Sequence, residues 1–440
     1  MFKLLAFSLL SAISLSAATP FQVGTARICI TPREPARLAG YAARTHASTG
    51  VAGDIWAKAL AIQDAHGGRV VIITMDLLRV PVTDLAGEMK RRYGLERSQF
   101  LLNCAHNHSA PSLWENDPFS ALSPEDREKS KRYTESLTAS LIELAGTALH
   151  NLAPASIRFG TGEASFGANR RYRTARGYDI RYNPDGPTDH RVPVLEVIGR
   201  DGKLRAVLFG YTCHNTTLPA SSYDVAGDYA GFAQEEIERA HPGATALFLQ
   251  LCAGDQDPHP RGTLALAKDH GKELASAVEK VLDGKLKNLR GPVRTAFETV
   301  DLALAPHTRE TFEQRLNDPN RAVVRTARAM LKDYDEGHPL RALSYPVQAV
   351  RIGPKLALVA IGGEPVVDYA LRAQRELPNV ILAGYSNRVQ GYIPSRRVLA
   401  EGGYEGGESA IYYGLPGPFT SDVEDSIFGG IKEVLRQSQK

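Results

Sequence analysis

Short apolar runs alternate with longer amphipathic stretches along this 440-residue chain. The runs at residues 70–75, 100–102 and 356–361 consist almost wholly of apolar residues, which is typical of buried strands. The stretches at 84–93 and 263–282 carry apolar residues at helical spacing. Strands that alternate with helices in this way predict an α/β fold, with a layered mixed sheet flanked by helices.

The same pattern predicts individual strands and helices. Strands are predicted over residues 70–75, 100–102, 192–198, 206–211, 244–251, 356–361 and 380–382. Helices are predicted over residues 84–93, 124–152, 230–240, 263–282, 365–376 and 420–436. Ser123 before Pro124 is typical of a helix start, and Thr420 or Ser421 is expected to cap the last helix.

Residues 306–335 are polar with helical spacing and are expected to form a surface excursion. The chain contains no long Pro/Ser-rich linker, no low-complexity tract and no fixed-period repeat. We therefore expect a single catalytic-type domain over residues 19–440.

The N-terminus has the pattern of a signal peptide. Lys3 precedes an apolar run over residues 4–15, and small residues at 16–18 suit cleavage after Ala18. This run is shorter than the roughly 20 residues that span a bilayer. We expect residues 1–18 to be removed and the mature protein to be secreted or periplasmic, without a stable membrane span; a retained N-terminal anchor is the alternative.

Composition excludes one class of partner. The 52 basic and 49 acidic residues give a net charge of +3, and both signs are interspersed along the chain. This balance does not suit nucleic-acid binding. The four cysteines have no CxxC spacing, so both buried free thiols and disulfides permitted by export stay open.

Several predicted strands end directly in side chains that bind metals or transfer protons. His106 and His108 follow the run at 100–102, His214 follows the run at 206–211, and Glu364 follows the run at 356–361. Loops after strands carry function in α/β folds because the sheet holds them rigidly. Each signal alone is weak, since loop histidines are common and a glutamate at a helix start complements the helix dipole.

Two further loops add candidates. Tyr392 lies in a loop rich in tyrosine, glycine and proline, and Asp255 and Asp257 follow the predicted strand at 244–251. The two aspartates could bind a cation, act as a base or form a turn before Pro258. Histidine, glutamate and tyrosine from separate strand ends suit a catalytic zinc with an open position for water, although iron and manganese accept the same ligands.

Several segments, in order along the chain, resemble the catalytic domain of the neutral (non-lysosomal) ceramidases. These segments are FQVGTARICITP (21–32), LAGYA (38–42), AHNHSAP (105–111), GDQDP (254–258), GYIP (391–394) and YEG (404–406). The resemblance covers nearly the whole chain after the signal peptide. It implies a zinc-dependent amidohydrolase with one zinc per chain, which cleaves a small-molecule or lipid N-acyl amide by attack of zinc-bound hydroxide.

The resemblance also implies roles for individual residues. His106, His214, Glu364 and Tyr392 would bind the zinc, and His108 would face the substrate and assist the transition state. Arg170 and Tyr404 would contact the substrate from opposite sides of the cleft.

Two departures stand out. Asp257 replaces the serine of the family's Gly-Asp-Val-Ser-Pro segment, and an ionised aspartate could act as a base. The chain also ends where the family continues into an immunoglobulin-like domain. Two alternatives stay open: a zinc esterase or phosphoesterase on the same fold, and a non-catalytic secreted binding protein.

Overall fold

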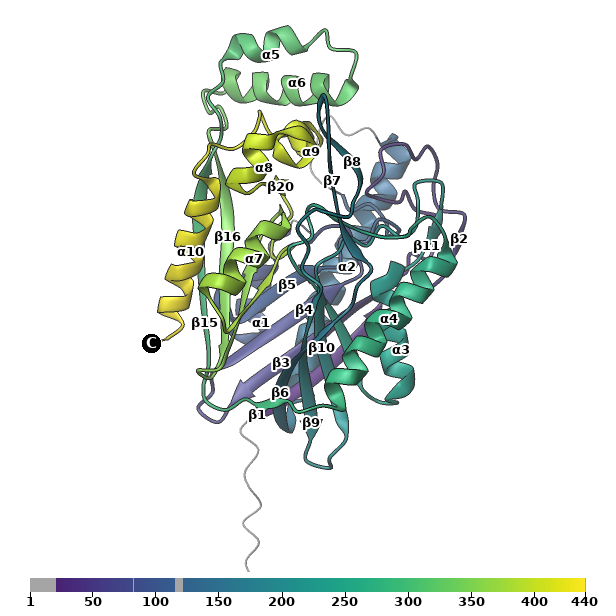
Figure 1. Cartoon of the computed structure of the whole chain (residues 1–440), viewed down its shortest axis with the longest axis vertical. Helices are drawn as coiled ribbons and strands as arrows, with labels where there is room; N and C mark the ends of the chain where they lie inside the picture. The colour runs from purple at the N-terminus through teal and green to yellow at the C-terminus, as the bar shows by residue number, and fades with distance from the viewer. Residues whose placement is uncertain (1–20, 82, 115–121, 440) are drawn as a thin grey trace, which may run out of the picture.

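The computed structural model describes residues 21–81, 83–114 and 122–439, so the expected signal peptide lies outside the described residues (Figure 1). A large mixed sheet has the strand order β12-β10-β9-β6-β1-β3-β4-β5, with β14 paired to β6. Its strands are β1 (Phe21–Cys29), β3 (Trp56–Asp64), β4 (Arg69–Met75), β5 (Phe100–Cys104), β6 (Ala153–Glu163), β9 (Arg191–Gly199), β10 (Leu204–Tyr211), β12 (Thr245–Gln250) and β14 (Lys287–Asn288).

A second sheet has the order β15-β16-β17-β19, formed by β15 (Val293–Ala303), β16 (Ala342–Ile352), β17 (Leu356–Ile361) and β19 (Val380–Ala383). Three small sheets complete the strands: β7 (Gly167–Thr174) with β8 (Gly177–Asn183) and β13 (Gln256–Pro258), β2 (Gly50–Val51) with β11 (Asp224–Val225), and β18 (Glu364–Pro365) with β20 (Tyr392–Ile393).

The helices are α1 (Leu85–Tyr93), α2 (Pro124–His150), α3 (Asp228–Ala240), α4 (Leu264–Leu282), α5 (Arg309–Arg315), α6 (Arg321–Asp335), α7 (Val367–Glu376), α8 (Arg396–Glu401), α9 (Gly403–Gly406) and α10 (Val423–Gln437). Helices α5 and α6 form the surface excursion and lie at one end of the molecule (Figure 1). Within the described ranges, none of the helices is both long and apolar enough to cross a bilayer.

The two main sheets pack face to face, and helices cover their outer faces. Leu208 on β10 and Val350 on β16 belong to the same buried cluster between the sheets. Their neighbours Val207 and Phe209 point the other way, into a cluster shared with α3 and α4. This alternation follows from the two-residue period of a strand. Helices α1 and α2 cover the remaining outer face of the large sheet. Helices α7 and α10 cover the outer face of the second sheet, β15-β16-β17-β19.

The α/β class with a layered mixed sheet is confirmed, and each predicted strand and helix has an observed counterpart. One detail is wrong: the last helix begins at Val423 with Asp422 at its N-cap, because the Thr420 hydroxyl bonds the Asp422 carboxylate instead of capping the helix. Several strands were not predicted from the sequence. Among them, β6, β8 and β15 are partly exposed over much of their length, whereas β3 and β16 are largely buried. The four cysteines are unpaired, and three of them are buried.

A buried amide network ties the ends of strands from both sheets together. The Asn103 amide donates to Gly384 O (2.8 Å) and Ser386 Oγ (3.0 Å), and Asn103 Oδ1 accepts from Gln250 N (2.9 Å). Asn215 extends the network, because its amide donates to Gln250 Oε1 at 3.0 Å. The loops that leave these strand ends are therefore fixed relative to one another.

We expect Asn103→Ala to lower the free energy of unfolding by about 3 kcal/mol or more, because it leaves several buried polar groups without partners. Urea denaturation measures the change. The exposed Asn288→Ala is the matched control and should stay within about 0.5 kcal/mol of the wild type. A loss below about 1 kcal/mol for Asn103→Ala would contradict the role assigned to the network.

Candidate active site

The loops after β5 and β10 bring two histidines together. An isolated parallel bridge joins Asn107 to Asn215, so the preceding residues His106 and His214 lie side by side, with ring centroids 4.9 Å apart. His106 has a positive φ of 56°, an uncommon conformation for a non-glycine residue, and here it turns the chain directly after β5. Both rings are buried at 2% exposure or less.

A second short pairing places Glu364 beside Tyr392. The two-residue strands β18 and β20 run parallel, with Glu364 opposite Tyr392. Gly254 allows the close approach of this unit to the loop after β12, because a Cβ at that position would lie 2.5 Å from Glu364 O. Two backbone pairings thus assemble four side chains that are up to 286 residues apart along the sequence.

The four side chains converge on one point. Glu364 Oε2 lies 3.0 Å from His106 Nε2 and 3.1 Å from His214 Nε2, and the Tyr392 hydroxyl lies 3.4 Å from His214 Nε2. Burial alone would raise the pKa of Glu364, but the two imidazoles hold it well below its usual value. Glu364 is therefore an anion at neutral pH.

The hydrogen bonds behind the rings assign their tautomers. His106 Nδ1 lies 2.9 Å from Leu78 O, and His214 Nδ1 lies 2.6 Å from Ala253 O. A carbonyl oxygen only accepts, so each Nδ1 carries the hydrogen, and in a neutral ring Nε2 then carries a lone pair. When both rings are neutral, two lone pairs and a carboxylate oxygen therefore face one another, whereas a protonated ring donates from Nε2 to Glu364. Such a convergence of acceptors is stabilised by a cation between them, and carbonyl partners on the far nitrogen are typical of metal-binding histidines.

Arg170 lies against the phenol of Tyr392. Its Nη2 donates to the Tyr392 hydroxyl at 2.9 Å. Burial raises the pKa of Tyr392 well above its usual value, and the guanidinium of Arg170 acts in the opposite direction. The pair suits a tyrosinate ligand, because the adjacent positive charge stabilises the phenolate oxygen.

Arg170 is held in place by two carboxylates and is only 6% exposed. Its Nε donates to Glu405 (2.9 Å), which also accepts from Arg171, and its Nη1 donates to Asp257 (3.1 Å). Although burial acts to raise it, Arg170 and Arg261 bring the pKa of Asp257 down to about 2. A carboxylate with this pKa is a poor proton acceptor at neutral pH. Of the two roles considered for Asp257, the geometry therefore favours that of a charge partner of Arg170 over that of a base.

The ring of His108 lies beside the two other imidazoles and makes no hydrogen bond with the described residues. Both of its ring nitrogens are buried and unpartnered among the described residues. One nitrogen from each of His106, His108 and His214 lies within 4.8 Å of the others. Burial lowers the pKa of His108 well below its usual value, so the ring is neutral at neutral pH. A neutral imidazole with free nitrogens can donate one hydrogen bond to a substrate or serve as a third nitrogen ligand.

Two tyrosines in the site escaped the sequence analysis. The Tyr413 hydroxyl donates to Glu364 Oε1, which fixes the carboxylate with Oε2 toward the histidines. Tyr385 packs on the His106 ring at 4.7 Å, and its buried hydroxyl has no partner among the described residues. Tyr385 lies in the tyrosine-rich loop that also contains Tyr392, whereas no pattern distinguished Tyr413 from its exposed neighbour Tyr412.

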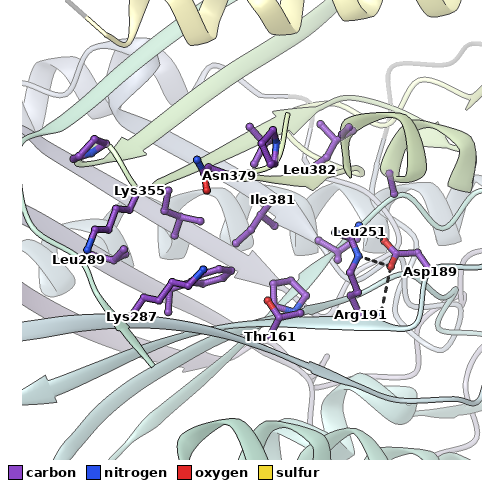
Figure 2. A pocket seen from close by; sticks show the side chains of 18 residues that line it. Thr161, Asp189, Arg191, Leu251, Lys287, Leu289, Lys355, Asn379, Ile381 and Leu382 are labelled. Carbon is purple, nitrogen blue, oxygen red and sulfur yellow. Dashed lines mark hydrogen bonds and ion pairs between the residues drawn. The ribbon is translucent and has the colours of Figure 1, made fainter. Parts of the chain in front are cut away.

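A cavity of about 720 Å³ opens over this cluster, within the range of small-molecule sites. His106, His108 and Tyr392 lie in its wall, and Tyr404 lines it with its ring 5.2 Å from that of Tyr392. A second cavity, of about 640 Å³, is lined by β6 and β9 of the large sheet and by β19 and α7, and contains none of the predicted site residues. Figure 2 shows that one, where Arg191 is paired with Asp189.

A face-to-face α/β sandwich with a buried histidine–glutamate–tyrosine cluster at its strand ends defines the class of this protein. The chain belongs to the neutral/alkaline non-lysosomal ceramidase family: the sequence model described as neutral/alkaline non-lysosomal ceramidase, N-terminal, matches residues 21–303. This match confirms the family that was assigned from the sequence, which is a family of ceramidase-like hydrolases.

Individual relatives are distant in sequence. The neutral ceramidase of Pseudomonas aeruginosa is 22% identical over 95% of this chain and 72% of its own length. That of Mycobacterium tuberculosis is 23% identical over 84% of this chain and 71% of its own length.

The fold is nevertheless shared with solved structures. The crystal structure of the P. aeruginosa enzyme matches with a TM-score of 0.74 at 19% identity, covering 94% of this chain and 74% of that chain. A ceramidase complexed with C2 matches with a TM-score of 0.73 at 18% identity, covering 95% and 76%.

Gly40→Ala tests the placement of His108. A Cβ at Gly40 would lie 2.4 Å from His108 Nδ1, so the substitution should displace the ring. We expect kcat/KM on an N-acylsphingosine to fall by about 10- to 100-fold, since small misplacements of reacting groups have effects of this size. Gly67→Ala is the matched control, because Gly67 has a similar φ of +88° but nothing within 4 Å. Equal activity of the two variants would contradict the prediction.

Asp257→Asn tests the charge pairing of Arg170. A carboxyl whose pKa falls from 3.8 to about 2 on folding stabilises the folded state above its ordinary pKa, and this contribution is lost as the pH falls toward 2. We expect the variant to be less stable by about 2 kcal/mol at pH 7, with the difference shrinking between about pH 4 and pH 2. Urea denaturation at pH 7, 5 and 3 measures it. The exposed Asp185→Asn is the control; a difference that does not change with pH would contradict the pairing.

Proposed function

We propose that this protein is an exported zinc-dependent amidohydrolase that cleaves an N-acyl amide of the ceramide type. The observation that carries the proposal is the convergence of His106 Nε2 and His214 Nε2 on Glu364 Oε2, at 3.0 and 3.1 Å. A buried cluster of acceptors at the bottom of a cavity is the arrangement that a bound cation requires. Membership of the ceramidase-like hydrolases supplies the bond class.

The donor set fits zinc. His106, His214, Glu364 and Tyr392 would hold the ion. The two imidazole nitrogens and the carboxylate oxygen are common zinc donors in proteins, and the phenolate oxygen of Tyr392 would be a fourth, less common donor. Zinc bound there would supply a Lewis acid and would lower the pKa of a water molecule to near 7. In the overall reaction, water adds to the amide carbonyl carbon and the C–N bond breaks, which releases a carboxylic acid and an amine.

The surrounding residues orient these groups. Tyr413 fixes Glu364 through its second carboxylate oxygen, and Arg170 stabilises the Tyr392 oxygen at 2.9 Å. His108 and Tyr404 face the cavity, where each can donate a hydrogen bond to the substrate carbonyl as negative charge develops on its oxygen. Asp257 holds Arg170 and does not need to change protonation state.

Two alternatives lead to different products. A zinc esterase or phosphoesterase would release an alcohol or phosphate from the same site, so identification of the products separates it from an amidase. A non-catalytic binding protein would have no need of a cluster of buried acceptors, and the cluster therefore favours an enzyme.

The proposal extends to the organisation and export of the chain. We propose that residues 19–440 form one catalytic domain, which is supported by the core that both main sheets share. The signal-peptide pattern of residues 1–18 supports secretion or export to the periplasm.

Metal analysis tests the proposal. We expect one zinc per chain in the wild-type protein, and loss of the metal in His106→Ala and His214→Ala, with activity on an N-acylsphingosine reduced by at least about 100-fold. The exposed His66→Ala should match the wild type. Chelation should abolish activity, and added zinc should restore it. A wild-type protein that binds no zinc and stays inactive when zinc is supplied would contradict the proposal.

A further inference from the structure

The cavity over the proposed zinc site is lined by positive charge. Its walls contain five arginines, Arg37, Arg44, Arg79, Arg127 and Arg325. Among the residues of this wall that the structure describes, there is no aspartate or glutamate. The arginines come from the loop after β1, the loop after β4, α2 and α6, so segments far apart in the sequence contribute to one basic cavity.

Four of these arginines, Arg37, Arg44, Arg127 and Arg325, lack a carboxylate partner among the described residues. Arg37 donates only to Arg44 O, and Arg325 makes no hydrogen bond or ion pair with the described part of the chain. Arg127 Nε is buried and without a partner there. Arginines elsewhere in the protein, such as Arg372 and Arg397, are paired with two or three carboxylates.

Arg44 adds a charge beneath the same wall. It is 4% exposed, and its guanidinium donates only to backbone carbonyls, of Ala39, His108, Ala220 and Ser222. Carbonyl oxygens stabilise the group without neutralising it. The positive charge of Arg44 therefore adds to the potential inside the cavity.

The acidic residues deeper in the site do not balance these arginines. Glu364, Asp257, Glu405 and Glu401 are accompanied by the guanidiniums of Arg170, Arg171, Arg261 and Arg397, equal in number. Asp255 is hydrogen-bonded to the amides of Asn169 and Gln256. A zinc ion would add two further positive charges. Arg37, Arg44, Arg127 and Arg325 of the cavity wall are thus positive charges that a negatively charged ligand would neutralise.

We propose that the substrate is an anionic N-acyl amide, whose carboxylate or phosphate group is bound by Arg127 and Arg325 while its amide lies over the proposed zinc site. This inference rests on the proposed amidase function and replaces the uncharged head group of a ceramide with an anionic one. Guanidinium groups match carboxylates and phosphates with paired hydrogen bonds, and an uncharged head group would leave them without partners. Tyr404, Tyr412, Tyr413 and Trp114 provide aromatic wall for the rest of the substrate.

Isosteric substrate pairs test the charge requirement on the zinc-loaded wild-type protein. One pair is N-dodecanoylglycine and N-dodecanoylglycinamide; the other is N-dodecanoylethanolamine and its O-phosphate. Released dodecanoic acid reports cleavage of the N-acyl bond in all four. We expect kcat/KM to be at least about tenfold higher for the anionic member, and this preference to weaken with added salt. The pair with the larger preference identifies the anion as carboxylate or phosphate.

Variants connect the preference to the residues. Arg127→Gln with Arg325→Gln should lower kcat/KM for the anionic substrate by about tenfold or more and leave the neutral substrate nearly unchanged. The control is Arg200→Gln with Arg328→Gln, which removes two exposed arginines outside the cavity, one of them from α6 itself. A preference for the neutral substrate, or an equal loss on both substrates in Arg127→Gln/Arg325→Gln, would overturn the inference and leave the amidase proposal intact.

If none of the four amides is cleaved, calorimetry measures how tightly each compound binds. Failure to cleave any of the four compounds would count against the proposed function only. Tighter binding of the anionic member, lost in the cavity variant and kept in the control, would still support the anionic ligand class. Equal binding of the charged and neutral members would overturn it.

Discussion

The site depends on the buried amides that hold the strand ends of two sheets together. Asn103, Gln250 and Asn215 bond to one another and to backbone groups where β5, β10, β12 and β19 end. An amide side chain both donates and accepts, so a few such residues satisfy buried backbone groups that have no partner within either sheet. His106 and His214 follow the ends of β5 and β10 by only a few residues, so the network also fixes their positions.

At these strand ends, hydrogen-bond acceptors of His106, His214 and Glu364 face one another. Two imidazole nitrogens and a carboxylate oxygen meet within about 3 Å, at the buried floor of the cavity. Carbonyl partners behind each ring and the Tyr413 hydroxyl behind Glu364 prevent the groups from turning away. Packing in the rest of the sandwich offsets the cost of this arrangement, which is unfavourable without a cation. Such a coupling between folding and cation binding is characteristic of metal sites.

Two groups of charged residues surround the His106–His214–Glu364 cluster: an inner level next to Tyr392 and an outer level in the cavity wall. In the inner level, Arg170 is matched by Asp257 and Glu405 and acts on the oxygen of Tyr392. In the outer level, Arg37, Arg44, Arg127 and Arg325 of the cavity wall have no carboxylate partner among the described residues. The aspartate that replaces the serine of the family pattern belongs to the inner level, where its negative charge holds a guanidinium in place.

The sequence by itself determined the α/β class, the family, and the positions of His106, His214 and Glu364 at strand ends, because apolar periodicity and local motifs are properties of neighbouring residues. It also pointed to Tyr392 and Arg170, through resemblance to the ceramidases. Only the tertiary structure decided that two sheets pack face to face, that Tyr413 orients Glu364, and that Asp257 is bound by two arginines. These features arise from contacts between residues tens to hundreds of positions apart, and the free energy of such contacts depends on distance and burial, which a local pattern does not encode.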